Sequence, residues 1–251
     1  MPLAKRIIPT ILCKGRQMVK GIAFESWRSV GSAQQGVRIH QARGVDELVL
    51  LDISATAEGR GPDLQLVGEL TADCFMPLAV GGGVHSLGDV SALLRAGADK
   101  VVIGTAAWTS DLIRQAAAIV GRQAIVVTCD VVPNAQEVDS LKAGVRCVRE
   151  TAPARARWAA DQGAGEILLT AVQREGAMKG YDLELIEAVS RAVDVPVIAH
   201  GGAGTYQHML EAIEAGADAV AAGSMFLFTE ATPRGAAEYL AQHGVETRVP
   251  A

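Results

Sequence analysis

The chain has 251 residues, of which 49% are hydrophobic and 20% are charged, and it contains 27 glycines. These proportions exclude disordered chains, which are poor in aliphatic residues, and collagen, because the glycines follow no three-residue period. The formal net charge of −5 argues against a surface that binds nucleic acid.

The sequence predicts neither a membrane span nor a secretory leader. The apolar runs at residues 48–51 and 124–128 stop at an acidic residue within a few positions, so they are too short to cross a bilayer. The basic segment 1–6 is followed only by the short apolar run 7–12, without the core and cleavage site of a signal peptide. We therefore expect a cytoplasmic protein.

The cysteines predict no special chemistry. Cys13, Cys74, Cys129 and Cys147 form no CxxC pair and show no metal-ligand spacing with the 5 histidines. In a reducing compartment such residues serve as small apolar side chains, so neither a zinc site nor a disulfide framework is expected. We expect the protein to use no metal and no cofactor.

In chain order, short aliphatic runs alternate with helical stretches about eight times, which favours a parallel sheet covered by helices. Most runs are nearly continuous in β-branched residues or leucine, as is typical of strands buried on both faces. The predicted strands are residues 6–12, 47–52, 77–80, 100–103, 124–130, 166–170, 196–199 and 219–222. The predicted helices are residues 33–43, 63–72, 87–96, 110–120, 153–162, 182–192, 205–215 and 233–243.

This alternation predicts an α/β fold, a single (β/α)₈ TIM barrel that spans residues 1–251 as one domain. An open, doubly wound sheet is the alternative, but the dinucleotide fingerprint GxGxxG is missing after the first strand. Residues 79–106 and 198–225 align without a gap at an offset of 119, and near strands one and five an offset of 118 places Leu12 over Asp130. The sequence therefore predicts two half-barrels related by internal duplication.

Glycine clusters end four of the predicted strands, at the barrel end that carries the active site in this fold. Glycine lets backbone N–H groups approach an anion, and a following helix N-terminus adds a favourable dipole. Tight strand-to-helix turns explain any one cluster equally well, but two clusters related by the duplication favour a ligand with a phosphate at each end. The predicted phosphate- and substrate-binding residues are Gly82, Gly83, Gly104, Thr105, Thr170, Gly201, Gly202, Gly223 and Ser224.

Four residues near the same rim are candidates for the chemistry. Asp130 ends a strand of apolar or small residues, so we expect its carboxylate to face the barrel mouth as an acid or base, or else to cap a turn. Asp52 ends another strand, with the same two alternatives. Lys20, in the loop after the first strand, is either a substrate-binding charge or an ordinary surface lysine. His200 precedes a glycine pair, where it is expected to titrate near neutral pH or to donate a hydrogen bond to a phosphate.

Several long segments carry a resemblance to one family. They are residues 5–9 (KRIIP), 45–48 (VDEL), 51–53 (LDI), 81–83 (GGG), 97–101 (GADKV), 163–170 (GAGEILLT), 180–182 (GYD) and 201–204 (GGAG). Over nearly the whole chain they resemble the cyclase subunit of imidazole glycerol phosphate synthase. That family is a (β/α)₈ barrel whose partner, a glutaminase, makes ammonia at the barrel base. The ammonia passes through the barrel and attacks a bisphosphorylated ribulosyl nucleotide, which agrees with the two-phosphate interpretation.

The resemblance implies roles for individual residues. Asp130 is similar to the family's catalytic acid on strand five, Lys20 to its lysine in the loop after strand one, and Gly176 to a phosphate-side position. The implied partner is a glutaminase, in a heterodimer. A ring of charged residues at the strand starts is implied to gate ammonia entry, although a plug of paired charges closing the barrel is the structural alternative. These residues are Arg6, Glu47, Lys100 and Glu166.

The chain also departs from this family. The family places a second catalytic aspartate at the end of strand one, in a segment similar to CLDVKDGR, whereas residues 10–16 here read TILCKGR, with Leu12 at that position. Leucine cannot transfer a proton, and loss of a positioned acid or base typically costs about 10²- to 10⁴-fold in rate. His200 stands where the family usually has serine, Gly104 where it has asparagine and Glu175 where it has aspartate.

These departures lead to three hypotheses. A leucine-type first strand, with residues 75–77 and 223–226, resembles a divergent branch found with amidotransferases of surface-polysaccharide synthesis, where it is thought to supply ammonia for acetamidino-sugar formation. This paralogue is the preferred hypothesis. The second is an authentic histidine-pathway cyclase in which another group, such as His200, replaces the missing carboxylate. The third is a catalytically silent scaffold that holds a phosphorylated ligand beside a glutaminase.

Overall fold

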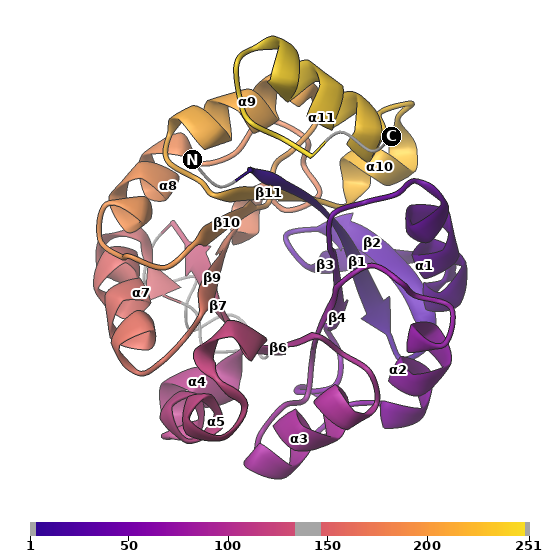
Figure 1. Ribbon diagram of the computed structural model, residues 1–251, viewed down its shortest axis with the longest axis vertical. Coiled ribbons are helices and arrows are strands. Elements are labelled where there is room, and N and C mark those ends of the chain that lie inside the picture. Colours follow the sequence, from indigo (N-terminus) through magenta and orange to yellow (C-terminus); the bar gives the residue numbers. More distant parts are fainter. Residues whose placement is uncertain (1–3, 134–146, 249–251) are drawn as a thin grey trace.

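The computed structural model describes residues 4–133 and 147–248, which form a closed parallel β-barrel surrounded by helices (Figure 1). The strands follow one another around the barrel in the order β11-β10-β9-β7-β6-β5-β4-β1. This architecture confirms the predicted (β/α)₈ fold. The barrel strands are β1 (Arg6–Lys14), β4 (Leu48–Asp52), β5 (Leu78–Gly81), β6 (Lys100–Ile103), β7 (Ile125–Val132), β9 (Glu166–Ala171), β10 (Val197–His200) and β11 (Ala219–Ala222).

The barrel closes where its first strand meets its last. Residues 6–9 of β1 pair in parallel with residues 219–222 of β11, and residues 10–13 of β1 pair with residues 49–52 of β4. Strand β1 therefore pairs with β11 through its first half and with β4 through its second half. The closed ladder leaves no unpaired sheet edge in the barrel and points all eight strands the same way.

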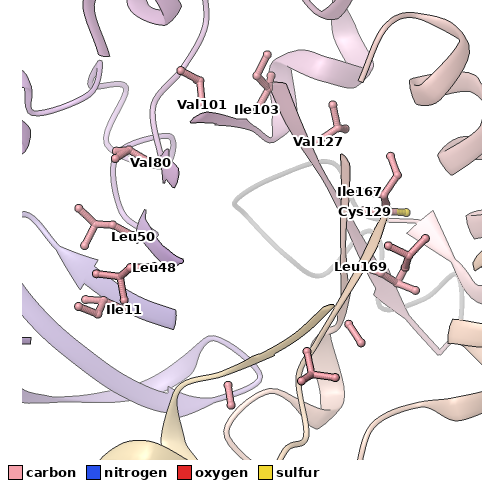
Figure 2. Close-up of a cluster of buried hydrophobic side chains, with 14 of the residues drawn as sticks. Ile11, Leu48, Leu50, Val80, Val101, Ile103, Val127, Cys129, Ile167 and Leu169 are labelled. Carbon is pink, nitrogen blue, oxygen red and sulfur yellow. The ribbon is translucent and has the colours of Figure 1, made fainter. Parts of the chain in front are cut away.

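Side chains along each strand alternate between the barrel interior and the layer beneath the helices. The outward side chains, such as Ile11, Leu50 and Val127, join the large core under the helices (Figure 2). The inward side chains form a smaller, separate cluster. Its members are Ile8, Val49, Ala79, Val102, Val126, Leu168, Ile198, Ala219 and Ala221. The alternation therefore decides which residues face the mouth, the rim formed by the carboxyl ends of the strands.

Helices cover the outside of the barrel. In the described residues the longer ones are α1 (Ala33–Ala42), α2 (Leu64–Thr71), α3 (Leu87–Arg95), α5 (Leu112–Val120), α7 (Ala152–Asp161), α8 (Leu183–Ser190), α9 (Tyr206–Glu214) and α11 (Pro233–Gln242). Each predicted helix is present, with ends that differ by one or two residues, because capping residues lie outside the helix proper. None of these helices is long and apolar enough to cross a membrane.

The internal duplication is visible in matching contacts. The carboxylate of Asp99 accepts a hydrogen bond from the backbone N–H of Leu78 at 2.8 Å, and that of Asp218 accepts one from Val197 at 3.1 Å. Helix N-caps repeat in the same way, since Ser86 caps α3 and Thr205 caps α9. Each of these aspartates binds the first residue of the preceding strand, so the two halves of the barrel use the same contact at matching positions.

The connections at the mouth contain elements that the sequence did not predict. The segment after β1 is an antiparallel hairpin, β2 (Gln17–Ile22) and β3 (Glu25–Ser32), rather than a loop. Its turn contains Ala23 and Phe24 at positive φ instead of the Asn-Gly or Asp-Gly pair that signals a hairpin in a sequence. Two short helices, α4 (Thr105–Thr109) and α10 (Ser224–Phe228), begin directly after β6 and β11.

Candidate functional site

The mouth is lined by inward-facing residues at the strand ends. Asp130 of β7 lies on the same face of its strand as the interior residue Val126, and it is paired in register with Thr170 of β9. Thr170 is in turn paired with His200 of β10, and its Oγ1 lies 3.2 Å from Nδ1 of His200. Three of the predicted site residues therefore form a row across adjacent strands. Asp130 also takes part in at least one further interaction.

Lys20 is buried rather than solvated. It lies on β2 of the hairpin, and its Nζ is 3.1 Å from Oε1 of Glu175, with both side chains almost fully buried. Nζ and Cε of Lys20 also occupy the space beside Gly223, where a Cβ atom would lie only 2.2 Å from Nζ. The hairpin thus carries the ammonium to Gly223. This residue belongs to the glycines that follow β10 and β11 (Gly201, Gly202 and Gly223), which we call the second glycine cluster. The interpretation of Lys20 as an ordinary surface lysine is wrong, because the hairpin folds over the mouth.

His200 has an altered proton affinity. Burial, together with the positive charge of Lys20, lowers the pKa of His200 to about 3. The imidazole is therefore neutral between pH 5 and 8, so the expectation that it titrates near neutral pH is wrong. A neutral imidazole can accept or donate a hydrogen bond at the mouth, but it does not supply a positive charge there.

Asp52 organises the loop that follows β4. Its Oδ1 accepts hydrogen bonds from the backbone N–H groups of Ser54 and Ala55 and from Oγ of Ser54, at 3.0 to 3.2 Å. Its Oδ2 lies 3.1 Å from the guanidinium of Arg60. Leu51, not Asp52, packs against the interior cluster. Of its two predicted roles, this geometry matches the capping role, and we assign Asp52 no part in the chemistry.

The second glycine cluster lines a pocket at the mouth. Ser224 Oγ and Glu175 Oε2 are both buried there with no hydrogen-bond partner among the described residues. A buried polar atom without a partner is uncommon in proteins and is satisfied when a ligand or water fills the space. The lining residues are Glu175, Gly176, His200, Gly201, Gly202, Ala203, Ala221, Ala222, Gly223 and Ser224.

Local packing requires glycine at some predicted phosphate positions but not at others. Gly202 has a φ of 111°, and a Cβ there would lie 2.1 Å from the carbonyl oxygen of Gly180. Gly82 and Gly83 are similarly confined, by the carbonyl oxygens of Asp52 and Arg60. Gly104 differs, because a Cβ would meet nothing closer than Thr128 Oγ1 at 3.7 Å. At Gly104 the missing side chain leaves room at the mouth rather than relieving a clash.

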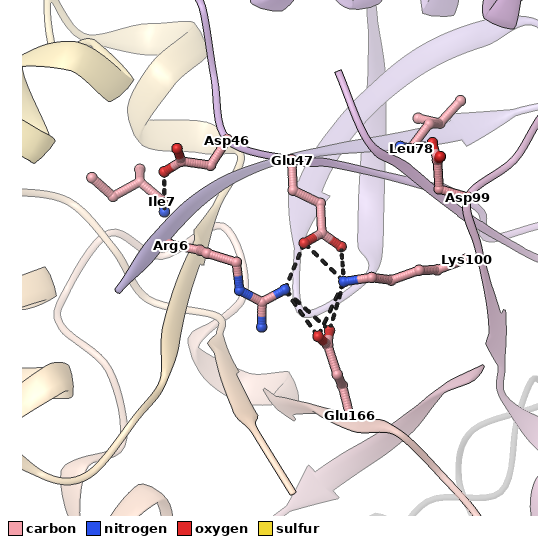
Figure 3. A network of polar contacts seen from close by, with 8 residues as sticks. All are labelled: Arg6, Ile7, Asp46, Glu47, Leu78, Asp99, Lys100 and Glu166. Carbon is pink, nitrogen blue, oxygen red and sulfur yellow. Dashed lines mark hydrogen bonds and ion pairs between the residues drawn. The ribbon is translucent and has the colours of Figure 1, made fainter. Parts of the chain in front are cut away.

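The four predicted gate residues meet at the opposite end of the barrel, which we call the floor: Arg6, Glu47, Lys100 and Glu166 (Figure 3). The guanidinium of Arg6 lies 2.6 Å from Glu47 and 3.0 Å from Glu166. Nζ of Lys100 lies 2.8 Å from Glu47 and 3.0 Å from Glu166. Each cation therefore bridges both carboxylates, which makes a closed ring of alternating charge.

Burial and charge compete at this floor. Burial alone would lower the pKa of Arg6, but the carboxylates of Glu166 and Glu47 raise it above its ordinary value. The Glu47 side chain is only 3% exposed, and its carboxylate contacts both cations. Loss of any one member would leave three charges that no longer balance in a site with little access to water, and this holds the ring together.

Leu12 occupies the strand end that corresponds to Asp130. It is 1% exposed, and it follows the interior residue Ile8 by four positions along β1, so it faces the barrel interior. The mouth therefore has a carboxylate at the end of β7 and a hydrocarbon at the end of β1. Among the described residues, no group of three or more His, Cys, Asp or Glu side chains is placed to hold a metal ion.

Glu175 and the β2–β3 hairpin are the parts of the site that sequence reasoning missed. Glu175 was noted only as a departure from the family pattern, although it binds Lys20 and its backbone carbonyl accepts a hydrogen bond from Ala23 at 2.9 Å. The one sequence feature that could have pointed to Glu175 is its position directly before Gly176, which the resemblance places on the phosphate side of the barrel. The backbone and side chain of Glu175 together hold the hairpin over the pocket.

Comparison with known proteins places the whole barrel in one group. The family model described as histidine biosynthesis protein matches residues 6–232, from β1 through α10. Imidazole glycerol phosphate synthase subunit HisF of Hyphomonas neptunium (strain ATCC 15444) is 45% identical over 250 residues, which cover 98% of this chain and 99% of that protein. The subunit of the same name from Nocardioides sp. (strain ATCC BAA-499 / JS614) is 44% identical over 242 residues, which cover 91% of this chain and 92% of that protein.

The low pKa of His200 predicts a loss of stability in mild acid. Below its ordinary pKa of about 6.5 the imidazole gains a proton in the unfolded chain, while the folded chain keeps it neutral down to about pH 3. The free energy of unfolding therefore falls as the pH decreases between these limits, by about 2 kcal/mol from pH 7 to pH 5 for this residue. Urea unfolding at pH 7 and pH 5 measures it. His200→Gln should show a correspondingly smaller loss, and equal losses in both proteins would contradict the assignment.

Proposed function

The chain belongs to the histidine biosynthesis protein family as a HisF-type cyclase subunit, and we propose that it works as the ammonia-using subunit of a glutamine amidotransferase complex. In this proposal a bisphosphorylated ligand lies across the mouth and a glutaminase docks at the floor. Ammonia travels from one end to the other inside the barrel. The observation that carries the proposal is the placement of an ionic floor and a glycine-lined pocket with an unpartnered serine hydroxyl at opposite ends of the same strands.

The mouth supports a ligand with a phosphate at each end. The glycine clusters after β5 and β10 are related by the duplication, and short helices begin beside each of them at Thr105 and Ser224. Backbone N–H groups at such helix starts favour an anion. Lys20, buried beside Gly223, brings an ammonium group to the second cluster, where Glu175 balances its charge. A phosphate entering there would satisfy Ser224 Oγ and would share Lys20 with Glu175.

The floor supports ammonia entry. A neutral molecule passes a ring of paired charges at lower cost than an ion does, because it carries no charge of its own to desolvate. The ring opens when one ion pair separates while the other three contacts persist. Phe75, which is 85% exposed and precedes β5 at this end of the barrel, offers an apolar contact for a docking partner.

The chemistry of the mouth supports an acceptor other than the histidine-pathway nucleotide. Asp130 is the proton-transfer group that we propose, with Lys20 and neutral His200 as binding groups. The end of β1, which the duplication relates to the end of β7, carries Leu12, and leucine cannot assist a second proton transfer. We therefore favour a paralogue that serves amidation of a surface sugar.

A second candidate rests on a different observation. Identity of 45% over nearly the full chain with proteins named as HisF subunits favours an authentic histidine-pathway cyclase. In that case a single carboxylate, Asp130, and the neighbouring His200 would share the proton transfers. The two candidates differ in one measurable property, which is turnover of the ribulosyl bisphosphate nucleotide.

Turnover with this nucleotide and an ammonium salt should separate the two candidates. The paralogue proposal predicts little turnover by the unaltered chain and a gain of about 10²-fold or more in Leu12→Asp, because a positioned carboxylate contributes that much. Product formation is followed by absorbance or chromatography.

Two variants control this measurement. Leu12→Asn has the shape of the aspartate but cannot transfer a proton, so it should gain nothing. Asp130→Asn in the Leu12→Asp background should abolish the gained activity. Full turnover by the unaltered chain would reject the paralogue in favour of the histidine-pathway cyclase, and turnover unaffected by Asp130→Asn would reject the role of Asp130.

The unpartnered hydroxyl of Ser224 offers a direct test of phosphate binding. Ser224→Ala removes no hydrogen bond within the described protein, so we expect unchanged stability but about tenfold weaker binding of inorganic phosphate, since a hydrogen bond to a charged group contributes about 1.5 kcal/mol. Binding is measured by calorimetry. The matched control is Ser190→Ala on α8, whose Oγ is also buried without a partner but lies outside the pocket. Equal phosphate affinity in both variants contradicts the proposal.

A further inference from the structure

Two buried thiols meet beside the mouth. Sγ of Cys129 lies 3.6 Å from Sγ of Cys147, and both residues are at most 5% exposed. Figure 2 shows Cys129 on β7 pointing away from the barrel centre, into the layer beneath the helices. No sequence pattern predicts this contact, since the two cysteines are 18 positions apart and form no motif.

The strand pairing explains why the thiols meet. The short strand β8 (Cys147–Val148) pairs in parallel with the end of β7, where Val131 is opposite Cys147 and Val132 is opposite Val148. Cys129 lies two positions before Val131, on the same outward face of β7. The ladder therefore places both side chains on the outward face of the paired strands, where the sulfurs reach each other diagonally across the pairing.

The contact makes the two thiols unequal. The hydrogen bond between them lowers the pKa of the Cys147 thiol and raises that of Cys129. Arg155 on α7 favours the thiolate at both positions, while burial opposes it. We take Cys147 as the attacking thiol, because it is the more exposed of the two and its pKa is lowered.

A surface pocket on the outside of the barrel lies next to residues that act on Cys147. A surface pocket of about 280 Å³ lies between α4 and α7, and its lining includes Thr151 and Arg155. These two residues also act on Cys147, Thr151 through a hydrogen bond and Arg155 through its charge. Both the pocket and the thiol pair lie on the outward face of β7, away from the barrel interior, so a ligand inside the mouth does not cover them.

We propose that Cys129 and Cys147 form a reversible disulfide when the protein meets a hydroperoxide such as hydrogen peroxide. The Cys147 thiolate attacks one peroxide oxygen, which gives a sulfenic acid and hydroxide. The Cys129 thiol then attacks the sulfenic sulfur, the S–S bond forms and water leaves. The two thiols lose two electrons and the peroxide gains them, and a dithiol reverses the reaction. The sulfurs must approach by about 1.5 Å to reach bonding distance.

The disulfide constrains the strand end that carries Asp130. Cys129 directly precedes Asp130, and the shift that closes the S–S bond acts on that peptide. We expect oxidation to lower turnover at the mouth at least tenfold, an expectation that rests on the proposed function. The disulfide itself does not depend on that function.

The experiment treats the full chain with hydrogen peroxide, blocks the remaining thiols and maps the linked peptides by mass spectrometry. The Cys13→Ser/Cys74→Ser double variant is the matched control, because Cys13 donates to the Leu51 carbonyl and Cys74 to the Met76 carbonyl rather than to another thiol. We expect a Cys129–Cys147 link in both proteins, released by dithiothreitol. Cys147→Ser should form no link, with a circular-dichroism spectrum that shows it is folded.

Three results overturn the proposal. These are oxidation of Cys147 to a sulfinic acid without a link, links that involve Cys13 or Cys74, and no oxidation of either thiol at peroxide concentrations that oxidise a free cysteine. Turnover in the ammonium assay, measured with the Leu12→Asp chain, adds a separate test. A linked protein with unchanged turnover overturns the constraint on Asp130. A chain without turnover even when reduced contradicts the proposed function but leaves the link as measured.

Discussion

The hydrogen-bonded closure of the sheet between β1 and β11 is the constraint on which the rest of the structure depends. Because residues 6–9 of β1 pair with β11 and residues 10–13 pair with β4, this strand shares one register with both neighbours. The same register places Arg6 at the floor and Leu12 at the mouth, on one inward face. If the pairing of β1 slipped by one residue, both side chains would turn outward. The floor would then lose Arg6 and the mouth would lose Leu12.

The function that we propose accounts for the ionic floor better than stability does. Replacing a buried ion network with well-packed hydrophobic side chains is often neutral or stabilising, so four charges inside a barrel are weak evidence of a stabilising device. A hydrophobic plug would close this end permanently. Paired charges also close the floor, but each ion pair remains able to separate. A gate for a neutral molecule, as we propose here, requires that the closure can open in this way.

The sequence predicted what depends on period and on local chemistry. Alternation of aliphatic runs with helical stretches predicted the eight barrel strands and the eight longer helices that cover them. It also gave the inward position of Asp130, because a strand of period two fixes the face of every residue. It did not give the β2–β3 hairpin, whose turn at Ala23 and Phe24 lacks the usual turn residues, and so it misplaced Lys20 in an open loop. The neutral state of His200 and the Cys129–Cys147 contact depend on burial and on pairing between distant strands, which no local pattern encodes.

The central claim is that nitrogen reaches the mouth from the floor, inside the barrel. An isotope competition tests it most directly: the Leu12→Asp chain, in complex with its glutaminase, is given the ribulosyl bisphosphate nucleotide, glutamine labelled with ¹⁵N in its amide, and an excess of unlabelled ammonium. The account predicts that the product carries mostly ¹⁵N, because the labelled ammonia never mixes with the solution. A product whose ¹⁵N content equals that of the bulk ammonium would contradict it.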